Sequence, residues 1–455
     1  MTDILSAPRG ELIVLVYELF DKIGALEAEN AHLRELLHQK GDGTLTKKDT
    51  PSFVKASVKK KRKKVRAKRE GSYHRAKEKP TKKVFHSFET CPDCGGNHLG
   101  KPSVGYTRQI IDLPQIQYQV IEHVVCKRWC FDCRKRTMPK VDFSSRALGS
   151  GWIGLKLAST IVLMKDRLRL SVYLIQKYLQ IFFNLKLSEG EIVEICHRSA
   201  AIGKPNYQKL LGELQSGDVV HGDETGGRED GKNGYYWSFS NPNTHILLYR
   251  KSRGSGVVKE LVGEDGSDFE GVLVTDFYTA YNAYTGFHQR CWVHLLRDIK
   301  ELKKNFPKHP PLNTWAQKVR IIYQEAKAYT GPPDNTPAGL SAQIRIEKQR
   351  YFEEKLKETC LPYRKKDIPM GTLCGRIITY LPELFVFVRF PHIPSDNNAA
   401  ERILRHIVIM RKVLGGTRSA HGSETRTILT SLLDTWQLRG LNVFDQCKLM
   451  LATCQ

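Results

Sequence analysis

Residues 219–225 read Val-Val-His-Gly-Asp-Glu-Thr, and residues 272–276 read Val-Leu-Val-Thr-Asp. Short apolar runs rich in β-branched residues are typical of strands, and the second run has the composition of a buried central strand. Asp223 and Asp276 stand at the ends of these runs. Taken singly, each is also an ordinary aspartate where a strand meets a loop. Together the two stretches predict strands that bring two carboxylates to one sheet.

Further strand patterns occupy residues 235–239 and 245–249, and a helical pattern follows near 256–261. The order of elements predicts a mixed sheet with an α/β continuation. Three strands come first, at 219–225, 235–239 and 245–249, and this helix and a last strand at 272–276 follow them.

A third carboxylate, Glu401, lies in the segment 395–402, Ser-Asp-Asn-Asn-Ala-Ala-Glu-Arg. Pro394 and the segment after it predict a helix start, and an apolar stripe continues to Gly-Gly at 415–416. Asn397, Glu401 and Arg405 are four residues apart, which predicts a shared polar face. Three converging carboxylates suit two Mg²⁺ or Mn²⁺ ions about 3.5–4 Å apart, because hard cations need anionic oxygen ligands.

Two C-x-x-C motifs precede this region: Cys91 with Cys94, and Cys130 with Cys133. Four thiolates at such spacing predict a closed, structural Zn²⁺ site rather than unrelated free thiols. A β ribbon of residues 106–111 and 117–123 is expected to fill the space between the motifs. Cys126 is a spare sulfur that could replace one ligand.

The chain is strongly basic, with 72 Lys and Arg against 48 acids, a net charge of +24 and a pI near 9.5. Nucleic acid is the commonest partner of such a chain, and no basic amphipathic helix favours a membrane surface instead. Residues 41–84 are predicted to form a disordered basic linker. We favour phosphate binding by this linker over a merely solvated chain. Its longest uninterrupted series of basic residues is Lys59, Lys60, Lys61, Arg62, Lys63 and Lys64.

Residues 8–40 carry a heptad pattern, with leucine at 12, 19, 26 and 33 and Asn30 on the second apolar row. This pattern favours a parallel coiled-coil homodimer over an amphipathic helix that docks on its own domain. Residues 150–215 have helical spacing, and Ser188 with Glu191 predicts a helix start. That region is interpreted equally well as a helix-turn-helix or as a helical hairpin.

The chain shows no signal peptide, and Lys156 and Lys165 bracket the most apolar candidate for a membrane helix. Its 11 cysteines are an odd number, scattered over a large chain, which favours thiols and metal ligands over disulfides. We therefore expect an intracellular protein, cytoplasmic and without a membrane partner.

Four strings carry a resemblance to a known family: GDETG at 222–226, VTDFYTAY at 274–281, CWVHLLRDIKEL at 291–302 and DNNAAERILRHIVIMRKVLGGTRS at 396–419. They resemble transposases of prokaryotic insertion sequences, specifically the insertion-sequence-66 family. The resemblance covers almost the whole chain, and the last string is its most specific signal. Gly227, after the first string, departs from the bulkier residue expected there.

This resemblance implies a multidomain α+β protein with a ribonuclease-H-like α/β catalytic core, split by a helical insertion. The implied parts are a zinc-binding β module at 85–145, a helical DNA-binding region at 150–215, a core at 216–305 and 391–420, an insertion at 306–390, and C-terminal helices at 421–455. It implies catalytic residues at Asp223, Asp276 and Glu401, and a C-x-x-H signature at Cys291 and His294. Packing or substrate positioning is favoured for this pair over a second zinc site.

The implied activity is metal-dependent DNA cleavage and strand transfer at the ends of an insertion sequence, in the nucleoid of a prokaryote. Element-encoded accessory proteins are a further partner that the resemblance suggests. Double-stranded DNA is the expected partner, contacted by Arg128, Arg402, Arg411 and Lys412 unless these are solvated surface residues. Two alternatives are a structure-specific DNA endonuclease with the same core and a catalytically dead, zinc-containing DNA-binding regulator.

Overall fold

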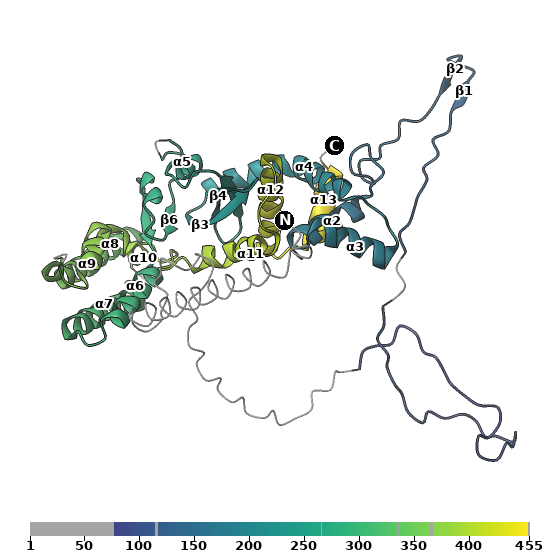
Figure 1. Ribbon diagram of the computed structural model, residues 1–455, viewed down its shortest axis with the longest axis horizontal. Coiled ribbons are helices and arrows are strands. Elements are labelled where there is room, and N and C mark those ends of the chain that lie inside the picture. Colours follow the sequence, from purple (N-terminus) through teal and green to yellow (C-terminus); the bar gives the residue numbers. More distant parts are fainter. Residues whose placement is uncertain (1–76, 114–116, 265, 335, 365–366, 454–455) are drawn as a thin grey trace, which may run out of the picture. The chain divides into compact units, whose positions relative to one another are not determined.

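The computed structural model describes residues 77–113, 117–264, 266–334, 336–364 and 367–453 (Figure 1). The chain divides into two compact units, 1–112 and 113–455, and each is described by itself. The predicted coiled coil at 8–40 lies outside the described residues, as does the basic run from Lys59 to Lys64.

The predicted ribbon of residues 106–111 and 117–123 is wrong, because the described residues of both segments lie in no strand. The two segments also fall in different units. Their apolar side chains, such as Ile110 and Val120, are exposed. An isolated two-stranded ribbon is at best marginally stable unless one face is buried, which accounts for the failed prediction.

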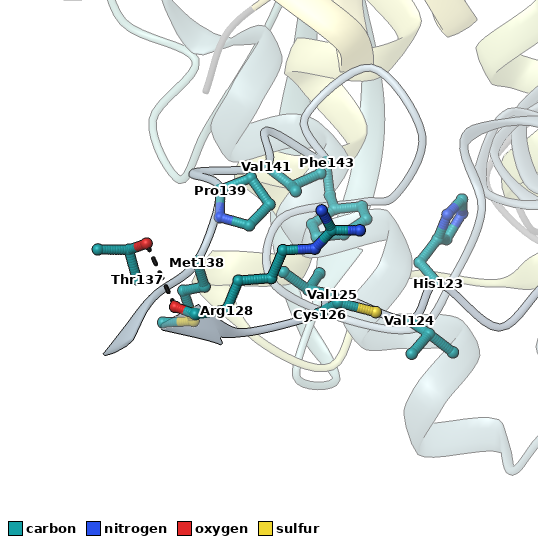
Figure 2. A pocket seen from close by; sticks show the side chains of 10 residues that line it. All are labelled: His123, Val124, Val125, Cys126, Arg128, Thr137, Met138, Pro139, Val141 and Phe143. Atoms are coloured by element: carbon teal, nitrogen blue, oxygen red, sulfur yellow. Dashed lines mark hydrogen bonds between the residues drawn. The ribbon is translucent and has the colours of Figure 1, made fainter. Parts of the chain in front are cut away.

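A short ribbon forms instead around the second C-x-x-C motif, from β1 (Arg128–Cys130) and β2 (Lys135–Thr137). The strands are antiparallel, with Trp129 opposite Arg136. The Thr137 hydroxyl donates a hydrogen bond to the Arg128 carbonyl at 3.5 Å (Figure 2). The motif itself is therefore the turn of this hairpin.

The centre of the second unit is a five-stranded sheet in the order β5-β4-β3-β6-β7. Its strands are β3 (Val219–Glu229), β4 (Lys232–Ser240), β5 (His245–Arg250), β6 (Val272–Thr275) and β7 (His288–Arg290). Strands β3, β4 and β5 pair antiparallel, whereas β6 is parallel to both β3 and β7. The four predicted strands and the helix α5 (Gly256–Val262) are confirmed, and β7 is additional.

Six helices share one hydrophobic core with this sheet: α5 together with α2 (Leu155–Asp166), α3 (Val172–Phe183), α4 (Glu189–Gln215), α12 (Ala420–Leu438) and α13 (Val443–Thr453). Trp237 and Phe239 of β4 are fully buried in it together with Leu214 of α4. The predicted capping box at the start of α4 is confirmed, since Ser188 and Glu191 exchange hydrogen bonds. Figure 1 shows α12 beside the sheet, where it contacts β5.

Helix α11 (Asn398–Leu414) covers part of the sheet through its contacts with β3 and β4. Leu404 and Ile407 pack there against Tyr236, Leu247 and Tyr249, a cluster separate from the larger core. Burying each of these two aliphatic side chains contributes roughly 1.5–3 kcal/mol. Gly415, with φ of +74°, ends the helix where the Gly-Gly pair predicts its end.

Between β7 and α11 the described chain is helical, with its own core around Trp292, Trp315, Phe352 and Phe385. It consists of α6 (Trp292–Asn305), α7 (Pro310–Ala328), α8 (Ala338–Cys360), α9 (Gly371–Thr379), α10 (Val386–Arg389) and two short 3₁₀ turns, η3 (Leu361–Tyr363) and η4 (Leu381–Glu383). None of the helices in the described part of the chain combines the length and apolar content needed to cross a membrane.

Candidate active site

The parallel pairing of β3 with β6 sets the relative position of the two aspartates. Val219 pairs with Val272, and His221 pairs with Val274. The pairing ends with His221 and Val274, and each aspartate follows the last paired residue of its chain by two positions. Because β3 and β6 are parallel, Asp223 and Asp276 both lie at the same end of the sheet.

The alternation of side chains along β3 determines which face Asp223 occupies. His221 contacts Asn397, the residue just before α11, and Thr225 accepts a hydrogen bond from Arg411 of α11 at 3.1 Å. Residues two apart on a strand share a face, so Asp223 lies on the face that α11 covers. Glu224 lies on the opposite face, where the Tyr281 hydroxyl donates to its carboxylate at 2.7 Å.

The electrostatic environment of Asp223 disfavours its negative charge. Burial raises the pKa of this carboxyl group to about 7, and the charges of Glu224 and Asp276 add to the effect. Glu401 contributes in the same direction, although the Glu224 backbone N–H donates to Asp223 at 2.9 Å and partly opposes it. The three predicted catalytic carboxylates therefore act on one another electrostatically.

The loop after Asp276 is held by a buried arginine. Arg290 of β7 donates to the Asp276 carbonyl at 2.8 Å and to the Asn282 side chain at 2.5 Å. Its guanidinium also pairs with Glu383 of η4 at 2.5 Å, and the side chain is fully buried. Sequence analysis did not identify Arg290, because a lone arginine before Cys291 does not reveal that it is buried. A fully paired buried arginine fixes the backbone that it contacts.

Asn397 joins α11, β3 and α6. Its side-chain amide donates to the Gly222 carbonyl at 2.7 Å, and its Oδ1 lies 2.9 Å from Nδ1 of His221. Its backbone N–H donates to the Cys291 sulfur at 3.1 Å. Asn397 was predicted to share the polar face of this helix with Glu401 and Arg405; it is buried and stands at the N-cap of α11, one position before the helix.

The C-x-x-H signature has two distinct environments. Cys291 is fully buried at the N-terminal end of α6, where its sulfur accepts the Asn397 N–H. His294, one turn later, places Nε2 3.5 Å from Oε1 of Glu401, and Arg297 lies 3.8 Å from the same oxygen. Among the residues that the structure describes, neither Oε1 of Glu401 nor Nδ1 of His294 has a hydrogen-bond partner, although both atoms are buried.

Glu401 stands in the first turn of α11, where the helix dipole favours a negative charge. Its side chain is about one third exposed and is directed to His294 and Arg297. Within the described parts of the chain, no three His, Cys, Asp or Glu side chains are arranged to hold a metal ion. The residues are nonetheless of the right kind, because three carboxylates offer the oxygen ligands that Mg²⁺ and Mn²⁺ prefer.

The four predicted zinc ligands are divided between the two units, Cys91 and Cys94 in the first, Cys130 and Cys133 in the second. In the first motif, the Gly95 N–H donates to the Cys91 carbonyl at 2.8 Å. Backbone N–H groups of Cys94 and Asp93 lower the pKa of the Cys91 thiol. Gly95 has a φ of +73°, which lets the turn close directly after the second cysteine.

The second motif repeats this geometry. Backbone and side-chain groups of Cys133 lower the pKa of the Cys130 thiol, with a smaller effect of the Asp132 N–H. Arg134, directly after Cys133, has a φ of +50° and so takes the place that Gly95 has in the first motif. Both turns therefore favour the thiolate form, which is the form that binds zinc.

Cys126 lies apart from these turns, in a pocket of about 420 Å³ at the base of the β1–β2 ribbon. Its neighbours in the lining are largely apolar, among them Val125, Met138 and Phe143 (Figure 2). The Arg128 side chain also lines this pocket.

The predicted DNA-contacting residues of α11 differ in their exposure. Arg402, Arg405 and Lys412 are exposed. Arg411 is half-buried and donates hydrogen bonds to the Thr225 hydroxyl and the Gly226 carbonyl of β3. Arg411 thus attaches α11 to the strand that carries Asp223.

Two family profiles match the chain. Residues 150–425 match the profile described as "Transposase IS66 family", which includes Asp223, Asp276 and Glu401. Residues 89–134 match the "zinc-finger binding domain of transposase IS66", which includes all four predicted zinc ligands.

Three proteins of Sinorhizobium fredii are similar to this chain, and all are described as uncharacterised. Protein y4hP is 22% identical over 396 residues, which cover 79% of this chain and 69% of y4hP. Protein y4jD is 23% identical over 384 residues, with coverage of 78% and 72%. Protein y4jO is 29% identical over 172 residues, covering 38% of this chain and 49% of y4jO, so that match spans about half of the relative.

Proposed function

The chain belongs to the IS66 family of transposases, and from this membership we propose that it cleaves DNA at the ends of an insertion sequence and joins the freed 3′ ends to target DNA. The observation that carries the proposal is the parallel pairing of β3 with β6, after which Asp223 and Asp276 follow at the same end of the sheet. Helix α11, which carries Glu401, covers β3. Phosphodiester chemistry of this kind needs closely placed carboxylates.

We further propose that the sheet is a ribonuclease-H-like catalytic core. The order of elements along the chain supports this assignment. Three consecutive antiparallel strands are followed by α5 and then by the parallel strands β6 and β7. The helices between β7 and α11 would be the insertion that splits the core, and their separate hydrophobic cluster agrees with that role.

The proposed catalytic residues are Asp223, Asp276 and Glu401. They would hold two Mg²⁺ or Mn²⁺ ions, which when bound activate the attacking oxygen and stabilise the leaving oxygen. Glu401 reaches such a position only if its side chain turns away from His294 and Arg297, which it contacts at 3.5 and 3.8 Å. The unpaired Oε1 of Glu401 supports this, because a buried carboxylate oxygen without a hydrogen bond is costly to maintain.

The residues around the triad have supporting roles in this proposal. His294 and Arg297 compensate the charge of Glu401 before its side chain turns to the metal ions, while Asn397 and Arg290 fix the backbones of β3 and of the loop after Asp276. One site would perform both steps, because hydrolysis and strand transfer are the same in-line displacement with water or a 3′-hydroxyl as nucleophile.

The remaining parts would bind and order the DNA. We propose that Cys91, Cys94, Cys130 and Cys133 hold one structural Zn²⁺. Arg128, Arg402 and Lys412 are exposed and would contact DNA phosphates. The coiled coil at 8–40 would form a homodimer, and the basic linker would add sequence-independent affinity. A helix-turn-helix in residues 150–215 and element-encoded accessory proteins stay predictions.

A strand-transfer assay tests the proposed function. The protein is incubated with Mg²⁺ or Mn²⁺, a pre-cut duplex carrying an element end, and a supercoiled target plasmid. We expect covalent joining of the 3′ end to the plasmid. A parallel reaction contains an uncleaved element end in place of the pre-cut duplex. Cutting of that end without joining in either reaction would favour the structure-specific endonuclease, and DNA binding without cutting or joining would favour the inactive regulator.

A further inference from the structure

On the side of β3 opposite to Asp223, an exposed arginine is supported by a buried carboxylate. Both Nε and Nη2 of Arg253 donate to Oε1 of Glu224, at 3.2 and 2.6 Å. The other oxygen of Glu224 accepts from the fully buried Tyr281 at 2.7 Å. The Glu224 side chain is 2% exposed, whereas that of Arg253 is 45% exposed. The carboxylate is thus the fixed partner, and the guanidinium faces the solvent.

Tyr278 fixes the same arginine from a second direction and links it to the other aspartate. The guanidinium carbon of Arg253 lies 3.9 Å from the centre of the Tyr278 ring. The Tyr278 hydroxyl donates to the Arg253 carbonyl at 2.7 Å, and the Tyr278 N–H donates to the Asp276 carboxylate at 2.8 Å. Arg253 is therefore tied to the residue after Asp223 and to the residue two positions after Asp276.

The hydrogen-bonding capacity of this guanidinium is only partly used. An arginine has five N–H donors in a planar fork, and two of those on Arg253 serve Glu224. Within the described part of the chain, its side chain has no other hydrogen-bond acceptor. A guanidinium held by a carboxylate and an aromatic ring loses little freedom when it binds an anion, which makes it suited to phosphate recognition.

We propose that Arg253 and Tyr278 form a phosphate-binding subsite for the DNA strand, next to the phosphate that reacts. The free N–H groups of Arg253 donate to a non-bridging oxygen of a backbone phosphate, and Glu224 and Tyr278 hold the guanidinium in place. This subsite rests on the proposed function, because its ligand is the DNA substrate of that reaction. A purely structural ion pair would explain the contact with Glu224, but it would not require an arginine whose remaining donors face the solvent.

A methylphosphonate scan of the pre-cut element end tests the subsite with the full-length protein. Each phosphate near the 3′ end is replaced in turn by a neutral methylphosphonate, and DNA affinity is measured without divalent cation. For wild-type protein we expect one position at which the replacement weakens binding about tenfold, the size of a lost charge-assisted hydrogen bond. In Arg253→Gln the unmodified end should bind about tenfold more weakly, and that same replacement should have no further effect.

Arg250→Gln is the matched control. Arg250 lies three residues earlier and pairs with Glu260, and both of those side chains are 41% exposed. This variant loses the same charge and a comparable ion pair, so it should keep the full effect of the sensitive methylphosphonate. Circular dichroism and the thermal midpoint check that both variants fold.

Two results would overturn the subsite. One is an unchanged methylphosphonate profile in Arg253→Gln, and the other is the same loss of affinity in Arg250→Gln. The binding measurement is independent of the reaction. A wild-type protein that joins no DNA but shows the Arg253-dependent profile would therefore refute the proposed function and keep the subsite.

Discussion

The side-chain amide of Asn397 donates a 2.7 Å hydrogen bond to the carbonyl of Gly222, the residue before Asp223. The start of α11 and the strand with the first aspartate are thus joined by a buried contact. Asn397 also contacts His221 and Cys291. Asn397 thus connects three segments that are far apart in the sequence, through its side chain to β3 and through its backbone N–H to Cys291.

Asn397→Ala should destabilise the protein and weaken strand transfer. The substitution leaves the buried Gly222 carbonyl and the His221 ring without a partner, which costs about 1–3 kcal/mol. Unfolding in urea measures this change. Asn398→Ala is the control, since Asn398 is the adjacent residue at the same helix end and is only partly buried. Equal stability losses in the two variants would contradict the role given to Asn397.

Asp223→Asn, Asp276→Asn and Glu401→Gln should each abolish cleavage and strand transfer and leave DNA binding intact. Removing one metal-holding carboxylate should lower the rate by at least about a hundredfold, more than the loss typical of an outer-shell partner. Gel-based assays of joining and of DNA binding measure the two effects separately. Asp230→Asn is the control, because Asp230 is an exposed acid with a φ of +50°, a conformation that asparagine tolerates. Full strand transfer by any one triad variant would remove that residue from the catalytic set.

The sequence predicted the strands of the site because their residues are apolar and β-branched. It did not predict β7, whose residues His288, Gln289 and Arg290 are polar but almost fully buried. Burial of polar residues depends on partners elsewhere in the chain, such as Glu383 for Arg290. A pattern of hydrophobicity cannot reveal such partners.

The helix that carries Glu401 was also predicted, but the role of Asn397 was not. Spacing by four placed Asn397 on a polar helix face, whereas α11 begins one residue later. A boundary shift of this size moves Asn397 from the polar face of the helix to its N-cap, where it is buried. Glu224 was overlooked for a related reason, because alternation along β3 places it on the face opposite to Asp223, against Tyr281 and Arg253.

The buried acid Asp434 should make stability depend on pH in a defined acidic range. Burial alone would raise the pKa of Asp434, but the hydrogen bond and charge of His245 and the charge of Arg167 together lower it to about 2. The carboxylate lies 2.8 Å from Nδ1 of His245 and 2.6 Å from Arg167. A folded pKa below the unfolded value means that the contribution is present above about pH 4 and is lost as the pH falls toward 2.

The free energy of unfolding, measured in urea at pH 7, should therefore be about 2 kcal/mol lower for Asp434→Asn than for the wild-type protein, because the variant lacks the ionised carboxylate. The difference should shrink to roughly half at pH 3, since the carboxyl group of the unfolded chain is then mostly protonated while that of the folded protein is still mostly ionised. Glu260→Gln is the control, because its ion pair with Arg250 is 41% exposed on both sides. A gap between wild type and Asp434→Asn that stays constant down to pH 3 would show that Asp434 does not act through its charge.

Zinc content distinguishes the four turn cysteines from Cys126. Both C-x-x-C turns lower the pKa of their first cysteine through backbone N–H groups, whereas Cys126 lies in a largely apolar pocket. Purified protein should contain about one zinc per chain, as expected for a four-thiolate site. Cys91→Ser and Cys130→Ser should each lose that zinc, and Cys126→Ser should retain it. The opposite result, zinc retained by Cys130→Ser and lost from Cys126→Ser, would assign the fourth ligand to Cys126. Cys130, in the turn of the β1–β2 ribbon, would then not bind zinc.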